Sequence, residues 1–282
     1  MNIFDAFGYG FIQRAIIAGC FVAVLCSTLG VFLVLRRFSL IGDGLAHVTF
    51  GSVAIGLFFH TAPVFASIPI VMLSSLGILR LAEKTKVYGD TAIGIVSSMG
   101  IAVGMILVSL SSGFNVDLLS FLFGSILAIS KAEVITAVIL SIVVIGLVVL
   151  FYNELVSITF DEEFAKVSGI KAHRINTILI LMTALTVVLA MKVVGIMLVS
   201  AMLIIPAASA LQVAKSFRMS IIIAGITSVF SVFSGIWISF ILNIPAGAAI
   251  IVINFIILML TLVYRMVWPS KEKIYVKVEA DK

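Results

Sequence analysis

The second apolar segment of the chain begins with an aspartate and a histidine four residues apart, Asp43 and His47. On a helix this spacing places both side chains on one face, where a carboxylate oxygen and an imidazole nitrogen can share a cation. Ionisable groups within a membrane-spanning helix usually face a protein interior or a transport pathway. The pair is a candidate metal site. The alternative is an aspartate at the headgroup level and a histidine hydrogen-bonded within the helix bundle.

The elements that must position this pair follow from the composition. Apolar residues make up 62% of the 282 residues and charged residues only 11%. Because one span consumes about 20 residues, a chain of this length holds about eight to ten helices and leaves no room for a soluble domain. We therefore expect an all-α polytopic integral membrane protein with one transmembrane domain over residues 1–282. Cys20 and Cys26 lie on different faces of one apolar segment, which indicates neither a disulfide nor a thiolate site.

Nine segments are predicted to span the membrane, with eight as the alternative count. They cover residues 11–35, 40–59, 64–81, 91–110, 134–151, 175–190, 193–213, 221–241 and 246–267. Residues 115–129 are also apolar but too short to cross, so we expect a short outer or re-entrant helix there. A further span at this position would invert the topology of everything downstream.

The basic residues support this arrangement. Of the 18 lysines and arginines, all but Arg14, Lys131 and Lys192 fall on one face of the predicted topology. Lysine and arginine collect on the cytoplasmic side of membrane proteins, which places the amino terminus outside and the tail at 269–282 in the cytoplasm. Basic loops beside anionic lipid explain the net charge of +5, so no nucleic-acid partner is indicated.

The longest interior connection, residues 152–174, has the pattern of a short amphipathic helix. Thr159 or Asp161 can cap its start, Phe164 and Val167 lie on one face, and Gly169 can end it. The acidic residues at its start suit the positive end of the helix dipole but fit an anionic membrane surface poorly. A soluble protein is the favoured partner for this helix, and the membrane surface is the alternative.

Other polar residues offer weaker signals. His60 ends the second span on the outer side, where it is either an exposed interfacial histidine or a weaker metal ligand. Lys192 lies in a tight outer turn. Its positive charge would repel a metal ion, so a structural or gating role is indicated. Asp117 and Glu133 flank the outer segment and could attract cations or pair with Lys131, and surface pairing is expected.

With these residues in place, the chain resembles the membrane permeases of bacterial zinc and manganese ABC importers. The resemblance covers nearly the full length in seven ordered blocks. They are Gln13–Gly19, Gly30–Arg37, Gly42–His47, Val116–Asp117 with Leu122–Ala128, Asp161–Ile170, Ala190–Gly195 and Leu203–Ala208.

The resemblance implies a homodimer in a bacterial cell (inner) membrane, with two ATP-binding cassette ATPase subunits on its cytoplasmic side. It also implies an extracytoplasmic metal-binding lipoprotein or periplasmic protein as the donor of the metal. Asp43 and His47 match the family's metal-pathway positions, and residues 161–170 resemble its coupling helix, which fits a groove on the ATPase. The residues expected to carry the coupling are Asp161, Glu162, Phe164, Ala165, Val167 and Gly169.

The function expected from the sequence is that of the permease of an ATP-driven importer that passes zinc by alternating access. No permanently bound cofactor is expected, and the absence of a Walker-type glycine loop or catalytic triad predicts that the chain is not itself an enzyme. Manganese and iron remain alternatives, since Asp and His suit them as well. Two other classes stay open: an ATP-independent secondary transporter, and an intramembrane zinc enzyme, which would need a third ligand and a general base.

Overall fold

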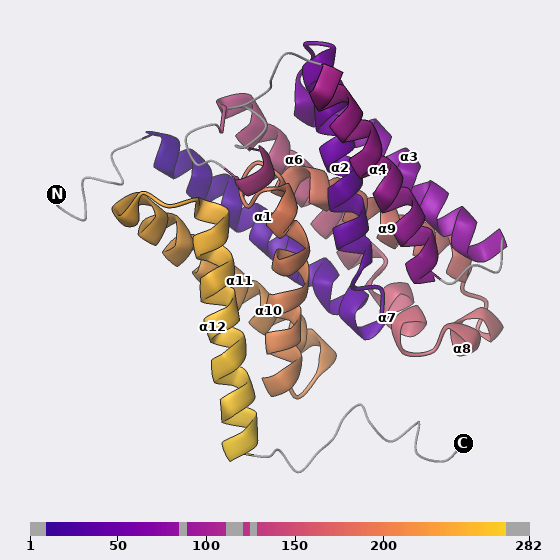
Figure 1. Ribbon diagram of the computed structural model, residues 1–282. Coiled ribbons are helices and arrows are strands. Elements are labelled where there is room, and N and C mark those ends of the chain that lie inside the picture. The colour runs from indigo at the N-terminus through magenta and orange to yellow at the C-terminus, as the bar shows by residue number, and fades with distance from the viewer. Residues whose placement is uncertain (1–9, 85–88, 111–120, 125–128, 269–282) are drawn as a thin grey trace.

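A computed structural model describes residues 10–84, 89–110, 121–124 and 129–268 (Figure 1). Among the described residues, nine helices are long and apolar enough to cross a bilayer, so the predicted all-α polytopic fold and the count of nine rather than eight are confirmed. The helices of these spans are α1 Gly10–Leu35, α2 Ile41–Phe58, α3 Pro63–Lys84, α4 Gly89–Leu110, α6 Lys131–Leu150, α9 Ala172–Ala190, α10 Val199–Val213, α11 Phe217–Leu242 and α12 Ala246–Val267. The predicted tail at 269–282 and most of the predicted outer helix at 115–129 lie outside the described residues.

Three shorter elements complete the fold. The 3-10 helix η3, Ile196–Leu198, leads into α10 and belongs to the same span. Between α6 and α9 the chain forms two short helices, α7 Tyr152–Phe160 and α8 Glu162–Val167. The second of them is the helix that the sequence predicts, whereas α7 falls in a stretch that the sequence analysis treats as a connection.

The core is built around α1, α2 and α9, whose spans are mostly buried inside the protein. In Figure 1 α1 runs through the middle of the bundle, and α12 stands at its edge. α1 is apolar around its whole circumference, as expected of a helix that is surrounded by others. By contrast, α4, α6 and α12 leave most of their surface uncovered, which suits helices that face lipid or another chain.

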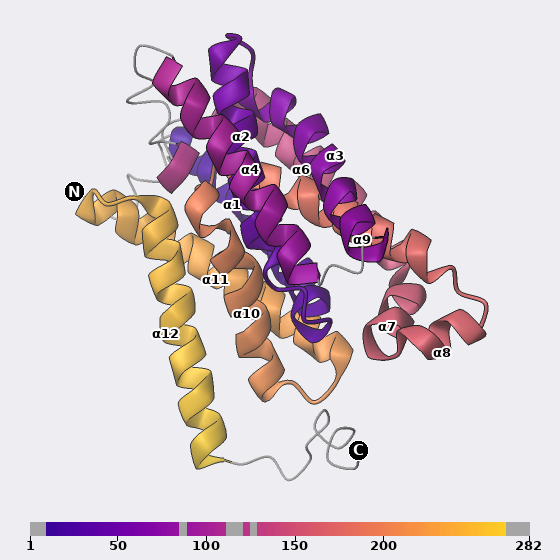
Figure 2. The same ribbon diagram turned by 45° about the vertical axis from the view of Figure 1, so that its right-hand side comes forward.

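α2, α3 and α4 lie side by side in both views (Figures 1 and 2). Glycines bring the backbones of α2 and α4 into close contact. A Cβ atom on Gly100 would lie 2.7 Å from Cα of Val48 and 2.9 Å from the carbonyl oxygen of His47, and one on Gly51 would lie 2.5 Å from the carbonyl oxygen of Gly100. Small residues of this kind allow close helix packing in membranes. This contact fixes how α2 is rotated, and so where the side chains of its first turns point.

Two ends of the bundle carry the contacts described below. We call the end with the α1–α2, α6–α9 and α10–α11 connections the basic end, because Arg36, Lys166 and Lys215 lie there. It occupies the lower right of Figure 1. The opposite end carries the α2–α3, α9–α10 and α11–α12 connections.

Candidate functional site

The candidate metal pair lies on the first two turns of α2, next to the basic end. A short connection leads there from α1, which ends in a turn with Arg37 at φ 60°. The amide of Phe38 donates to the carbonyl of Leu33, and the amide of Ile41 donates to the carbonyl of Phe38. α2 begins directly after this connection, so Asp43 lies in the first turn of the helix. Its carboxylate there suits the positive end of the helix dipole.

The geometry of the pair is compatible with a shared cation. Nε2 of His47 lies 3.6 Å from Oδ2 of Asp43, and the two side chains are 25% and 53% exposed. Two ligands about 2.1 Å from one tetrahedrally coordinated ion are about 3.4 Å apart, so an ion could bind between these atoms with little rearrangement. Nδ1 of His47 is buried and has no hydrogen-bond partner among the described residues.

Among the residues that the structure describes, Asp43 and His47 are the two candidate ligands at this point. No group of three or more His, Cys, Asp or Glu side chains that could hold a metal occurs in the described part of the chain. His60 is exposed just beyond the far end of α2, with φ 52°. Thirteen residues of helix separate it from His47, a distance of about 20 Å. His60 therefore does not belong to the same site, and no third His, Cys, Asp or Glu joins the pair within the described ranges of the chain.

The predicted coupling helix forms as α8. The carboxylate of Asp161 accepts a hydrogen bond from the amide of Phe164 at 2.8 Å and caps the helix. Gly169, at φ 86°, follows its last turn, and the amide of Ile170 reaches back to the carbonyl of Ala165. Both ends therefore match the sequence prediction, with Asp161 rather than Thr159 as the cap.

One face of α8 holds it to the protein and the other is uncovered. Ala165 is fully buried, whereas Phe164 is 67% and Val167 89% exposed. Two large apolar side chains that project from a short helix at the basic end are a typical contact surface for another protein. Lys166 lies on the polar part of α8. Its hydrogen bond to Glu163 and, to a smaller extent, its hydrogen bond to Glu162 raise its pKa.

A polar cluster that the sequence analysis does not identify joins α8 to the rest of the bundle. Arg36 donates from Nη2 to Oε2 of Glu162 at 2.8 Å and from Nη1 to Oδ1 of Asn176 at 2.6 Å. Its side chain is only 7% exposed. Burial lowers the pKa of Arg36, and the neighbouring Glu162 carboxylate opposes that shift. An arginine remains charged under these conditions, so the contact is an ion pair between a nearly buried guanidinium and a partly exposed carboxylate.

A second ion pair lies at the opposite end. Nζ of Lys192 is 3.2 Å from Oε1 of Glu133 and 4.1 Å from the ring centre of Phe121. Glu133 also accepts from the amide of Ser130 and so completes a capping box at the start of α6. The expected pairing of Glu133 with Lys131 is wrong. Lys131 is two residues away on the same helix and on a different face, whereas the α9–α10 turn brings Lys192 directly over Glu133.

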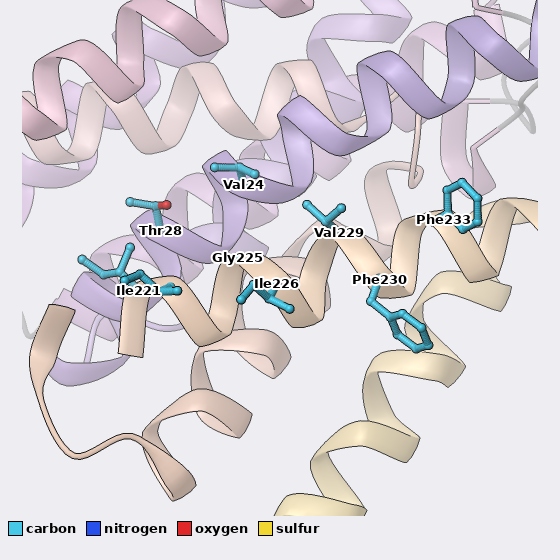
Figure 3. Close-up of a pocket in the computed structure, with 9 residues that line it drawn as sticks. Val24, Thr28, Ile221, Gly225, Ile226, Val229, Phe230 and Phe233 are labelled. Atoms are coloured by element: carbon cyan, nitrogen blue, oxygen red, sulfur yellow. The ribbon is translucent and has the colours of Figure 1, made fainter. Parts of the chain in front are cut away.

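An open groove between α1 and α11 offers no alternative site for a cation. Figure 3 shows its lining, which is almost entirely apolar, with Thr28 as the one hydroxyl-bearing side chain that it labels. Val24 and Thr28 come from α1, and Ile226 and Phe230 are among the residues that α11 contributes. A neutral hydroxyl alone does not replace the hydration of a divalent ion. The candidate site therefore remains the Asp43–His47 pair.

The described part of the chain holds nine candidate spans, an acid–histidine pair at the start of the second and a short exposed helix at one end. These features are typical of a polytopic membrane protein of the transporter class. A family model described as the ABC 3 transport family matches residues 8–265. The chain therefore belongs to the ABC 3 transport family, and the resemblance drawn from the sequence is confirmed.

Individual relatives extend over nearly the whole chain. A Listeria innocua protein named manganese transport system membrane protein MntC is 34% identical over 261 residues, which cover 91% of each chain. A Haemophilus influenzae protein named high-affinity zinc uptake system membrane protein ZnuB is 32% identical, over 89% of this chain and 96% of its own. The structure of PsaBC from Streptococcus pneumoniae in complex with Fab matches with a TM-score of 0.80 at 28% identity, over 92% of this chain and 94% of that one. The chain is thus a membrane subunit of a transporter and not itself an enzyme.

Proposed function

We propose that this protein is the membrane permease of a bacterial ATP-driven importer of divalent metal ions, and that the ion passes between Asp43 and His47. The 3.6 Å separation of Nε2 of His47 and Oδ2 of Asp43 is the observation that carries the proposal. An imidazole nitrogen suits a first-row transition metal, and the carboxylate offsets part of the hydration that the ion loses. A pair of ligands also holds an ion weakly enough to release it, as conduction requires.

Zinc is the proposed cargo, and manganese is the second candidate. Zinc accepts a nitrogen–oxygen set in tetrahedral geometry, which two copies of the Asp43–His47 pair can supply. The name of the Listeria relative favours manganese, and that of the Haemophilus relative favours zinc. The two relatives are about equally identical to this chain. The same two ligands are acceptable to either ion, so the cargo depends on the ligands that complete the site.

The proposed assembly is a homodimer in the bacterial inner membrane. Asp43 is half exposed in the isolated chain, and an ionised carboxylate on a membrane-spanning helix usually faces a protein interior or a transport pathway rather than lipid. A second copy facing it across a two-fold axis would cover both carboxylates and complete the coordination. An extracytoplasmic binding protein would deliver the metal at the opposite end.

The basic end is the proposed cytoplasmic face, which puts the amino terminus outside. Its arginines and lysines fit the usual charge bias of membrane proteins. The exposed Phe164 and Val167 of α8 would fit an apolar groove on each of two ATPase subunits. ATP-driven closure of those subunits would then move α8 and change the exposure of the Asp43–His47 pair by alternating access.

Metal uptake into proteoliposomes tests this function. The permease is reconstituted with its ATPase and metal-loaded binding protein, and uptake of zinc and of manganese is measured for the wild type, Asp43→Asn, His47→Gln and His60→Gln. His173→Gln is the matched control, because this histidine is exposed at the basic end, away from the pair. Loss of even an outer-shell partner commonly weakens metal binding 10- to 100-fold, so uptake should fall at least about ten-fold in the first two variants.

Each result has a definite meaning. ATP-dependent uptake that is lost in Asp43→Asn and His47→Gln but kept in His173→Gln supports the proposed pathway, and the ion taken up identifies the cargo. Wild-type uptake in both pair variants would contradict a role in the pathway. Uptake without the ATPase would point to a secondary transporter instead. His60→Gln should transport normally if this histidine is a surface residue.

A further inference from the structure

We propose that Arg36, Glu162 and Asn176 form the joint through which a movement of α8 reaches α2 and the Asp43–His47 pair. The inference rests on the proposed function, in which α8 docks on an ATPase. Arg36 stands at the end of α1, Glu162 begins α8 and Asn176 lies in the first turns of α9. One guanidinium therefore connects the end of α1 to the consecutive helices α8 and α9, which lie 126 or more residues further along the chain, through hydrogen bonds of 2.8 and 2.6 Å.

The joint is strong and directional. A charged donor and acceptor form hydrogen bonds about twice as strong as neutral ones, and the planar guanidinium fixes the direction of each. The side chain of Arg36 is nearly buried and that of Glu162 is 36% exposed, so solvent screens the pair only in part. Asn176 also donates to Oε2 of Glu162 at 3.4 Å, which closes the cluster into a triangle. A displacement of Glu162 must therefore either break these bonds or carry Arg36 with it.

The path from Arg36 to the metal pair is short and stiff. The guanidinium lies 5.5 Å from the ring centre of Phe38, so the side chain packs back on its own connection. The amide of Phe38 is bonded to Leu33, and its carbonyl accepts from the amide of Ile41 in the first turn of α2. Asp43 follows two residues later. No glycine and no long loop separates Arg36 from α2 to absorb a displacement.

A second set of contacts at the basic end is apolar and gives no such direction. The ring of Phe217 at the start of α11 contacts Phe32 of α1 and also Tyr152 and Phe160 of α7, with ring centres 5.1 to 6.1 Å apart. These contacts seat α7 against the bundle. Apolar packing of this kind is non-directional, so it stabilises the position of α7 without linking α8 to α2 specifically. A purely structural role for Arg36 would affect folding, whereas a transmitting role affects the use of ATP.

The decisive experiment compares Glu162→Gln with Glu163→Gln. Both substitutions remove one negative charge from α8, but Glu163 is 84% exposed and its carboxylate pairs with Lys166 rather than with Arg36. The full complex with ATPase and metal-loaded binding protein is reconstituted in proteoliposomes, and metal uptake and ATP hydrolysis are measured together. Allosteric couplings usually correspond to 5- to 150-fold effects, so uptake per ATP hydrolysed should fall roughly ten-fold in Glu162→Gln and stay unchanged in Glu163→Gln.

The outcomes separate this proposal from the proposed function. If the wild-type complex shows no ATP-driven uptake, the proposed function fails. If the wild type transports and the two variants use ATP equally well, only the joint is refuted. A parallel fall of hydrolysis and uptake in Glu162→Gln would place Glu162 in ATPase docking and also refute the joint.

A charge swap covers the case in which Glu162→Gln does not fold. Arg36→Glu combined with Glu162→Arg restores an ion pair in the same place, and Asn176 can turn its amide to donate to the new carboxylate. The joint predicts that the double variant transports several-fold more metal per ATP than Arg36→Glu alone. Equal ratios in the double and single variants would refute it.

Discussion

At the basic end, separate segments of the chain meet through long side chains, because Arg36 reaches from α1 to Glu162 of α8 and Asn176 of α9. At the opposite end, the Glu133–Lys192 ion pair also joins two segments, but other segments meet directly through their backbones. A Cβ atom on Gly195 would lie 2.5 Å from the backbone of Gly124, and one on Gly247 would overlap the carbonyl oxygen of Val194. We call Gly124, Gly195 and Gly247 the glycine junction.

The difference concerns what each end allows. A guanidinium bonded to Glu162 and Asn176 moves with them, so the segments at this end can shift together while their hydrogen bonds stay intact. Backbones packed directly on backbones have no side chains between them that could rearrange, so the segments of the glycine junction hold their relative positions. We therefore expect the glycine junction to act as the fixed end of the bundle and the joint around Arg36 as the end that moves and passes the movement on. The predictions below test this contrast.

The largest effect is expected for Gly247→Ala. The added methyl group would collide with the carbonyl oxygen of Val194 and lie 2.8 Å from that of Phe123, and neither backbone can yield as a side chain would. Overpacking of this kind costs about 3 kcal/mol of the free energy of unfolding. Gly146→Ala is the control, because no atom lies within 4 Å of its added Cβ. It should stabilise α6 by about 0.5–1 kcal/mol.

Denaturant titration of the purified variants in one detergent measures both changes. Equal stability of Gly247→Ala and Gly146→Ala would show that the junction adjusts easily and would remove the contrast between the two ends.

An intermediate effect is expected for Glu133→Gln. The substitution leaves the mostly buried ammonium of Lys192 without its carboxylate, and loss of one partner of a fully buried pair costs about 3–5 kcal/mol. Because both side chains retain some exposure, we expect about 2 kcal/mol. Lys192→Met should cost less, since the capping box between Glu133 and Ser130 remains.

The double variant of Glu133→Gln and Lys192→Met decides whether the two residues act as a pair. Its loss of stability should be smaller than the sum of the single losses, as for residues in direct contact. Strict additivity would show that the pair contributes nothing to holding the α9–α10 turn against α6.

A smaller loss is expected for Asn176→Ala at the basic end. The variant removes one of the two hydrogen-bond acceptors of Arg36 but leaves Glu162 in place. A hydrogen bond to a charged group contributes about 1.5–3 kcal/mol, and the flexible guanidinium should recover part of it, so we expect about 1.5 kcal/mol. Thr177→Ala is the neighbouring control, since its hydroxyl bonds only the carbonyl of His173 in its own helix. A larger loss than that of Glu133→Gln would reverse the proposed order of rigidity.

The sequence predicts those features that local chemistry determines. α12 has the predicted bounds, because a long apolar run follows Pro245 and ends before the polar tail. The two ends of α8 also follow from local residues, the Asp161 cap and Gly169. α7 was not predicted, because residues 152–160 mix polar and β-branched residues and only Leu155 and Ile158 mark its buried face.

The long-range contacts could not be predicted in the same way. Arg36 and Glu162 are 126 residues apart, and nothing in either neighbourhood specifies the other. Their meeting depends on how α1, α8 and α9 are rotated and packed. The Asp43–His47 pair could be predicted because both residues lie on one helix at a fixed spacing, whereas that spacing does not specify which residues of other helices or chains would complete the proposed site.

The smallest effect is expected for Asp161→Ala, which removes the cap of α8 without touching the joint. The amide of Phe164 would lose its 2.8 Å hydrogen bond, and loss of such a cap costs about 1 kcal/mol of helix stability. Because α8 is short and exposed, the loss should appear as faster amide hydrogen exchange in residues 162–170, while global unfolding changes little. Glu163→Gln, which leaves the cap intact, is the control. If amide exchange also accelerates in the first turn of α2, the joint transmits disorder as well as displacement. If amide exchange is unchanged even in α8, the Asp161 cap does not determine the stability of this helix.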